Sequence, residues 1–185
     1  MRERLTRRQL IDVFGEDNVV RGTPAGITHP FTRRFLAEVG VPVTGRAEFV
    51  QFAEGFPDEL TPLTEPVPPA LADAWYIGDA FGAVFVTIAL DGETGTVHAV
   101  PEGHEEPYLM NTDIESLVFF LTTLERRHEQ FSAELVEDGE AFAEAARTIE
   151  REWRAHDPAP FAVPEGEVMR VWPNLLDDIE CGTIG

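Results

Sequence analysis

A β-hairpin is predicted over residues 83–100, which read AVFVTIALDGETGTVHAV. Apolar residues fall on both faces of a period-two strand over residues 83–90, so both faces of this strand favour burial. The DGETG segment supplies turn residues that accept a positive φ, and residues 96–100 return as the partner strand. A strand of this kind lies inside a sheet, and the rest of the chain must be placed around this hairpin.

Helical patterns on either side of the hairpin supply elements that can cover the sheet. A Thr112/Glu115 capping box is expected to start a helix over residues 112–125. Its apolar side chains recur at helical spacing and are expected to cover one face of the sheet: Ile114, Leu117, Leu121 and Leu124. A Thr6/Gln9 capping box is expected to start another helix over residues 6–14. The other expected helices span residues 30–39, 139–155 and 173–182, and the other expected strands span residues 48–52 and 168–171. At 185 residues the chain has the length of one ordinary domain, so we predict a single domain over residues 1–185.

A proline-rich segment interrupts the elements between residues 55 and 70. Proline fixes its own φ and cannot donate a backbone hydrogen bond, so closely spaced prolines disfavour helices and sheets. The segment is therefore predicted to be an ordered surface loop. Its prolines are Pro57, Pro62, Pro66, Pro68 and Pro69.

The charge of the chain is strongly negative and unevenly distributed. The formal net charge is -20 at pH 7, and the interval between Arg46 and Arg126 holds fifteen Asp and Glu residues with no Arg or Lys. Such a surface repels phosphate backbones and anionic lipids and attracts basic partners. Direct binding to nucleic acid or to a membrane is therefore not expected. The alternative is that the acidity serves only solubility.

Cysteine content and hydropathy point to the cytoplasm. The chain has one cysteine, Cys181, which cannot form an internal disulfide, so nothing in its cysteine usage indicates an oxidising compartment. No apolar stretch is long enough to cross a bilayer. We therefore expect a soluble cytoplasmic protein.

The residues that common catalytic mechanisms require are missing from the sequence. All fourteen basic residues are arginine, which excludes mechanisms that depend on a catalytic or phosphate-binding lysine. Neither serine lies in a G-x-S-x-G motif, and Cys181 has no histidine close in sequence to activate it. His98, His104 and Glu105 could supply metal ligands, but they lack the H-E-x-x-H spacing. We expect no catalytic residue, no cofactor and no metal.

The order of several segments resembles the SUKH superfamily, specifically its fourth-numbered subfamily of bacterial immunity proteins. The resemblance is clearest over residues 28–125, and it extends more loosely to the C-terminal tail. The segments that carry it are FTRRFLAEVGVP, the proline-rich loop, YIGDAFGAVFVTIALDGETGTVHAV, MNTDIESLVFFLTTLE and VWPNLLDDIECGT.

The resemblance implies an α+β domain with a central, mostly antiparallel sheet flanked by helices, and no catalysis. Members of this family bind and neutralise a toxin of the same or a rival bacterium, commonly a nuclease or nucleic-acid deaminase domain of a polymorphic toxin. The charge is consistent with such a partner, because carboxylates can occupy a basic groove that is built for phosphates.

The toxin-binding surface is expected where acidic side chains project from loops. The acidic link over residues 102–107 is the main candidate, together with the proline-rich loop and the start of the helix that follows the link. The predicted toxin-binding residues are Asp58, Glu59, Glu102, Glu105, Glu106, Asp113 and Glu115. A charge run that is merely solvated is the alternative for this surface.

Two other functions stay open at this point. Other members of the superfamily are interaction modules in signalling, so a non-catalytic regulatory or adaptor role is the second hypothesis. A hydrolase that uses His98, His104 and Glu105 is the third. A pull-down separates the first two, because an immunity protein captures one toxin domain and an adaptor captures several partners, and metal analysis tests the third.

Overall fold

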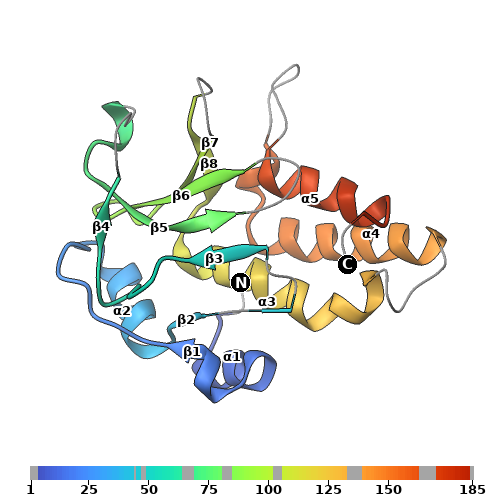
Figure 1. Cartoon of the computed structure of the whole chain (residues 1–185), viewed down its shortest axis with the longest axis horizontal. Coiled ribbons are helices and arrows are strands. Elements are labelled where there is room, and N and C mark those ends of the chain that lie inside the picture. The colour runs from blue at the N-terminus through green and yellow to red at the C-terminus, as the bar shows by residue number, and fades with distance from the viewer. Residues whose placement is uncertain are drawn as a thin grey trace.

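An antiparallel sheet of six strands is built around the predicted hairpin in the computed structural model (Figure 1). The structure describes residues 4–43, 45–46, 49–63, 69–80, 85–101, 106–132, 139–162 and 170–183. The strand order is β3-β5-β6-β7-β8, and β4 pairs with β5 beside β3. The strands are β3 (Val50–Phe52), β4 (Thr61–Pro62), β5 (Ala74–Ala80), β6 (Val86–Asp91), β7 (Val97–Pro101) and β8 (Tyr108–Asn111).

The hairpin prediction is confirmed, since β6 and β7 pair from Val86↔Pro101 to Leu90↔Val97. The turn is closed by Asp91, whose Oδ1 accepts the backbone N–H groups of residues 93 and 94 at 2.8 and 3.0 Å. Gly95 has a φ of 81°, and a Cβ there would lie 2.2 Å from a ring nitrogen of His29. Only glycine can therefore close this turn against helix α2. The predicted strand residues before 85 lie outside the described residues.

The proline-rich segment forms more regular structure than its prolines suggest. β4 pairs with the same edge of β5 as β3 does, and Pro62 lies opposite Trp75. The prediction of an irregular loop is thus wrong at Thr61–Pro62, because an edge strand tolerates a residue without a backbone N–H when that side faces away from the sheet. A 3-10 turn follows at Pro69–Leu71, and residues 64–68 of the predicted loop lie outside the described residues.

Five α-helices are present in the described ranges, and they gather on one face of the sheet (Figure 1). α1, α2 and α4 pack against α3, and α5 packs against α4. None of them combines the length and the apolarity that a membrane crossing requires. A second small sheet pairs β1 (Val19–Val20) with β2 (Val41–Pro42). The helices are α1 (Arg7–Phe14), α2 (Pro30–Glu38), α3 (Ile114–Phe131), α4 (Gly139–His156) and α5 (Val171–Glu180).

Helix starts agree with the sequence patterns at α1 and differ at α3 and α5. The Thr6/Gln9 capping box is present. At α3, however, the N-cap is Asp113, whose Oδ1 accepts the N–H of Ser116 at 2.8 Å, so the predicted Thr112/Glu115 box is wrong. Helix α5 begins at Val171, where a strand was predicted. At α3 a second cap residue lies next to the expected one, and local sequence alone does not choose between them. At α5 the N-cap Arg170 makes no side-chain cap hydrogen bond, so the sequence carries no cap signal there.

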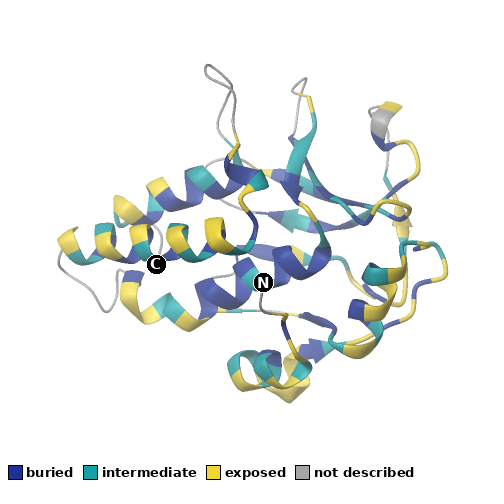
Figure 2. Cartoon of the chain, turned by 180° about the vertical axis from the view of Figure 1, so that it is seen from behind, coloured by how far each residue is buried: buried dark blue, intermediate teal, exposed yellow. Residues whose placement is uncertain are grey.

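The hydrophobic core lies between the inner face of the sheet and α3. On β6 the inward side chains of Val86, Ile88 and Leu90 are fully buried, and they belong to the same buried cluster as the apolar face of α3. Leu121 of that face is 9% exposed, so the predicted placement of the helix is confirmed. Figure 2 shows this buried side of α3 against the exposed outer sides of α1, α4 and α5.

An aromatic cluster joins the three C-terminal helices to the sheet. The rings of Phe120 and Trp153 stack at 4.7 Å, and Trp172 lies edge-on to both at 5.1 Å. The indole N–H of Trp172 donates to the carbonyl of Met110 at 3.0 Å and thereby fixes α5 to β8. Large buried aromatics of this kind contribute strongly to stability, so the C-terminal helices are an integral part of the core.

Candidate protein-binding surfaces

The face of the sheet opposite the helices, called the open face below, is only partly exposed in the described part of the chain, because Ala89 of β6 is fully buried there in a small apolar cluster with Leu71 and Ala74. On β6 and β7 the inward residues are buried, whereas the outward residues Thr87, His98 and Val100 are half-buried. Phe85, directly before β6, is 42% exposed, which makes it one of two exposed large hydrophobic side chains among the described residues. The exposed part of a sheet face that carries such side chains is a candidate interaction surface.

A hydrogen-bonded carboxylate lies on this open face. Asp79 of β5 accepts a hydrogen bond from the hydroxyl of Tyr76 at Oδ2 (2.6 Å) and one from the hydroxyl of Thr87 at Oδ1 (3.3 Å). Asp79 and Thr87 are direct cross-strand partners, while a bulge between Tyr76 and Gly78 brings Tyr76 to the same carboxylate. Burial, and then the hydrogen bond to Asp79, raise the pKa of Tyr76 to about 12. The phenol therefore remains a donor, and the carboxylate is held in one orientation.

His98 also points to the open face, but its surroundings do not form a metal site. Its Nε2 lies 2.9 Å from the hydroxyl of Thr96, and burial lowers its pKa against the opposing effect of Asp91. No group of three or more His, Cys, Asp or Glu side chains within the described residues is placed to hold a metal ion. His104 and Glu105, the other two candidate ligands, lie outside the described residues. Cys181 is a free and exposed thiol that follows α5.

The interval without basic residues corresponds to the large sheet. Strands β3–β8 and most of α3 fall between Arg46 and Arg126, so no strand of this sheet carries an arginine or a lysine. The arginines of the described residues lie before β3, on the helices, or just before α5. The charge asymmetry of the sequence thus becomes a spatial one, because the sheet and the segments that join its strands carry acids without an arginine, whereas the arginines belong to the rest of the fold.

The predicted acidic residues do not form one patch. Glu106 is exposed and lies just before β8, at one edge of the sheet. Asp58 and Glu59 are exposed in the segment between β3 and β4, at the other edge. Strands β5, β6 and β7 lie between these edges. The Oδ1 of Asp58 also accepts the backbone N–H of Thr23 at 3.2 Å, so this carboxylate helps to hold the loop.

The two acids at the start of α3 serve the fold. Asp113 caps the helix. The side chain of Glu115 is buried, with the residue only 2% exposed, and its Oε1 accepts the backbone N–H of Leu5 at 2.7 Å. Glu115 therefore does not belong to an exposed acidic surface, contrary to the prediction. Its burial depends on a partner 110 residues away, which no local pattern reveals. Glu102 and Glu105 lie outside the described residues.

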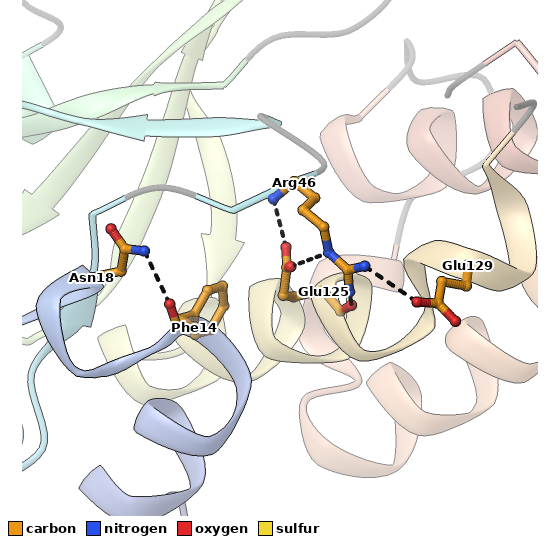
Figure 3. A network of polar contacts seen from close by, with 5 residues as sticks. All are labelled: Phe14, Asn18, Arg46, Glu125 and Glu129. Atoms are coloured by element: carbon orange, nitrogen blue, oxygen red, sulfur yellow. Dashed lines mark hydrogen bonds and ion pairs between the residues drawn. The ribbon is translucent and has the colours of Figure 1, made fainter.

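An ion pair that the sequence did not predict fixes the segment before β3 to α3 (Figure 3). The carboxylate of Glu125 accepts the backbone N–H and the Nε of Arg46, each at 2.7 Å, and Arg46 also donates to the backbone carbonyl of Glu125. Glu129 accepts a longer bond at 3.5 Å. The carboxylate of Glu125 raises the pKa of Arg46. A small hollow beside this contact is lined mostly by apolar side chains, including the exposed Val43.

The chain matches the model of one protein family, described as SUKH-4 immunity protein, over residues 5–178. No curated protein and no solved structure matches it. The matched range covers every helix and strand described above except the last turn of α5.

Proposed function

The chain belongs to the SUKH-4 immunity protein family, and we propose that it binds one cognate toxin of a bacterial polymorphic toxin system and neutralises it by direct contact. The family is one of non-catalytic immunity proteins, which implies a toxin as the partner. The observation that carries the finer proposal is the anionic sheet. Exposed acids lie in the segments that join its strands, and none of the six strands carries an arginine or a lysine.

The toxin that fits this surface is a basic domain that handles nucleic acid, such as a nuclease or a deaminase. Such a domain needs a positively charged groove for the phosphate backbone. An anionic protein surface is attracted to that groove and can occupy it in place of the phosphates. The net charge of -20 supports this partner and disfavours any anionic one.

Exposed acids at both edges of the sheet are proposed to steer the toxin toward its docked position. Asp58 and Glu59 lie at one edge, and Glu106 lies at the other with Glu102 and Glu105 of the same link next to it in sequence. Exposed charges at the rim of an interface act mainly on the rate of association and on its salt dependence. These residues are therefore expected to govern how fast the complex forms.

The test is protection combined with direct binding. The probe is the toxin domain encoded by the gene next to this chain's gene, expressed in bacterial laboratory cells with and without this protein. We expect co-expression to restore growth, and the purified pair to form a stoichiometric complex. The proposal fails if the toxin kills equally well in the presence of this protein. Capture of several cytoplasmic proteins and no toxin would support the adaptor role instead.

A further inference from the structure

We propose that Asp79, oriented by Tyr76 and Thr87 and lying on the same open face as Phe85, receives an arginine or lysine side chain of the toxin. This inference rests on the proposed function and adds a short-range contact to it. The acids at the edges of the sheet act at long range, whereas Asp79 is the group on this face that a bound cation would touch. The open face of β5 and β6 then lies inside the interface.

The first support is the orientation of the carboxylate. Each oxygen of Asp79 accepts a hydrogen bond from a neutral hydroxyl, at 2.6 and 3.3 Å. A carboxylate oxygen has a second acceptor position, so two hydroxyls leave capacity for a guanidinium or an ammonium group. A side chain that is already fixed loses little conformational entropy when a partner binds. Asp79 is therefore prepared for binding before the toxin arrives.

The second support is charge. Asp79 is half-buried, and its hydrogen-bond partners in the described structure carry no positive charge. A carboxylate that is partly removed from water without a cation lacks compensation for its lost hydration. The strands around it supply no arginine, since the interval 47–125 contains none. A basic side chain from outside the molecule is the missing complement.

The third support is the aromatic side chain on the same face. Phe85 precedes Thr87 by two residues, so the period of a strand places it on the outward side, and it is 42% exposed. An exposed aromatic ring and a carboxylate on one face of a sheet match an arginine, which can pair with an acid and stack on a ring. Central contacts of this composition dominate the affinity of many protein interfaces.

The experiment measures the Kd of wild type and three variants for the catalytically inactive toxin domain encoded next to this chain's gene. Asp79→Asn removes the charge and keeps the shape, and Phe85→Ala truncates the exposed ring. Asp17→Asn is the matched control, because Asp17 is an exposed acid on the helical side of the molecule. We expect Asp79→Asn to raise the Kd about tenfold or more, Phe85→Ala about fivefold, and Asp17→Asn less than about twofold.

Salt separates this contact from long-range steering. The ratio of the Kd values of Asp79→Asn and wild type should persist at high salt, since a pair buried in an interface is screened little. If both Asp79→Asn and Phe85→Ala bind as tightly as wild type, the inference is wrong while the proposed function stands. If wild type itself does not bind the toxin, the proposed function fails. Should Asp79→Asn fail to fold, the Kd of Phe85→Ala decides the matter.

Discussion

The backbone N–H of Leu5 donates to Oε1 of Glu115 at 2.7 Å, and this contact ties the segment before α1 to the first turn of α3. Both residues are buried. A carboxylate in the first turn of a helix is also stabilised by the helix dipole, which explains how a buried acid is accommodated there. The residue that the sequence suggested as part of a binding surface is thus a structural anchor.

Glu115→Ala should lower the free energy of unfolding by about 1–3 kcal/mol, because it leaves the N–H of Leu5 buried without this acceptor. Urea unfolding followed by circular dichroism measures the change. Glu38→Ala on α2 is the control, since Glu38 is exposed, and its effect should stay within about 0.5 kcal/mol. Equal stability of the two variants would show that the contact has no structural role.

Leu117→Ala and Leu121→Ala should both destabilise the protein, and Leu117→Ala should do so more strongly. Leu117 is fully buried, whereas Leu121 is 9% exposed and lines the small hollow near Glu125. Leucine-to-alanine changes in a core cost about 2–5 kcal/mol, and the cost is lower where neighbours can relax into the space. Thermal and urea unfolding would give the two values. The reverse order would contradict the assignment of the core.

Arg46→Ala should destabilise the protein, and a second change, Glu125→Gln, should recover part of the loss. Glu125 has a side chain that is 7% exposed, so without the guanidinium it retains a buried charge with fewer partners. The expected cost of Arg46→Ala is about 1–3 kcal/mol, at the low end for a buried pair because Arg46 itself is half-exposed. A double-mutant cycle measures the coupling. Strict additivity of the two changes would mean that the pair is not coupled.

Tyr76 should make the stability depend on pH in the alkaline range. Its pKa is raised from 10.0 to about 12 in the folded protein, so above pH 10 the unfolded chain loses this proton first. The contribution of Tyr76 to the free energy of unfolding is fully present below pH 10 and is lost as the pH rises toward 12. The difference between the ultraviolet titrations of wild type and Tyr76→Phe isolates this group. Asp79→Asn should remove only part of the rise in the pKa of Tyr76, because burial is the larger cause. A pKa of 10 for Tyr76 in wild type would contradict its burial and its hydrogen bond to Asp79.

Features that depend on neighbouring residues could be predicted from the sequence. The Thr6/Gln9 capping box and the hairpin turn at Asp91 are each closed by contacts within a few positions, and both are confirmed. The apolar face of α3 was also correctly identified from its spacing. The prediction of α5 was less accurate, because a strand was expected where Val171 starts the helix.

Features that depend on distant partners could not be predicted in this way. Strand β5 contains Gly78 at a φ of 150° and a bulge, and neither favours a strand when the sequence is considered alone. The meeting of Tyr76, Asp79 and Thr87 follows from that bulge and from the pairing of β5 with β6. The burial of Glu115 likewise requires the N-terminal segment to return to α3. Charge counting found the anionic interval but could not separate its structural acids from its exposed ones.

The central claim is that an anionic surface brings this protein to a basic toxin, and the association rate constant at two salt concentrations tests it most directly. Wild type, Glu106→Arg and the control Glu16→Arg on the helical side would be mixed with the inactive toxin domain at about 50 mM and about 500 mM salt. We predict that association of wild type slows by about tenfold or more at the higher salt. We also predict that Glu106→Arg slows association at low salt and that Glu16→Arg does so less. Rates that do not change with salt, together with equal rates for the two charge reversals, would contradict the claim.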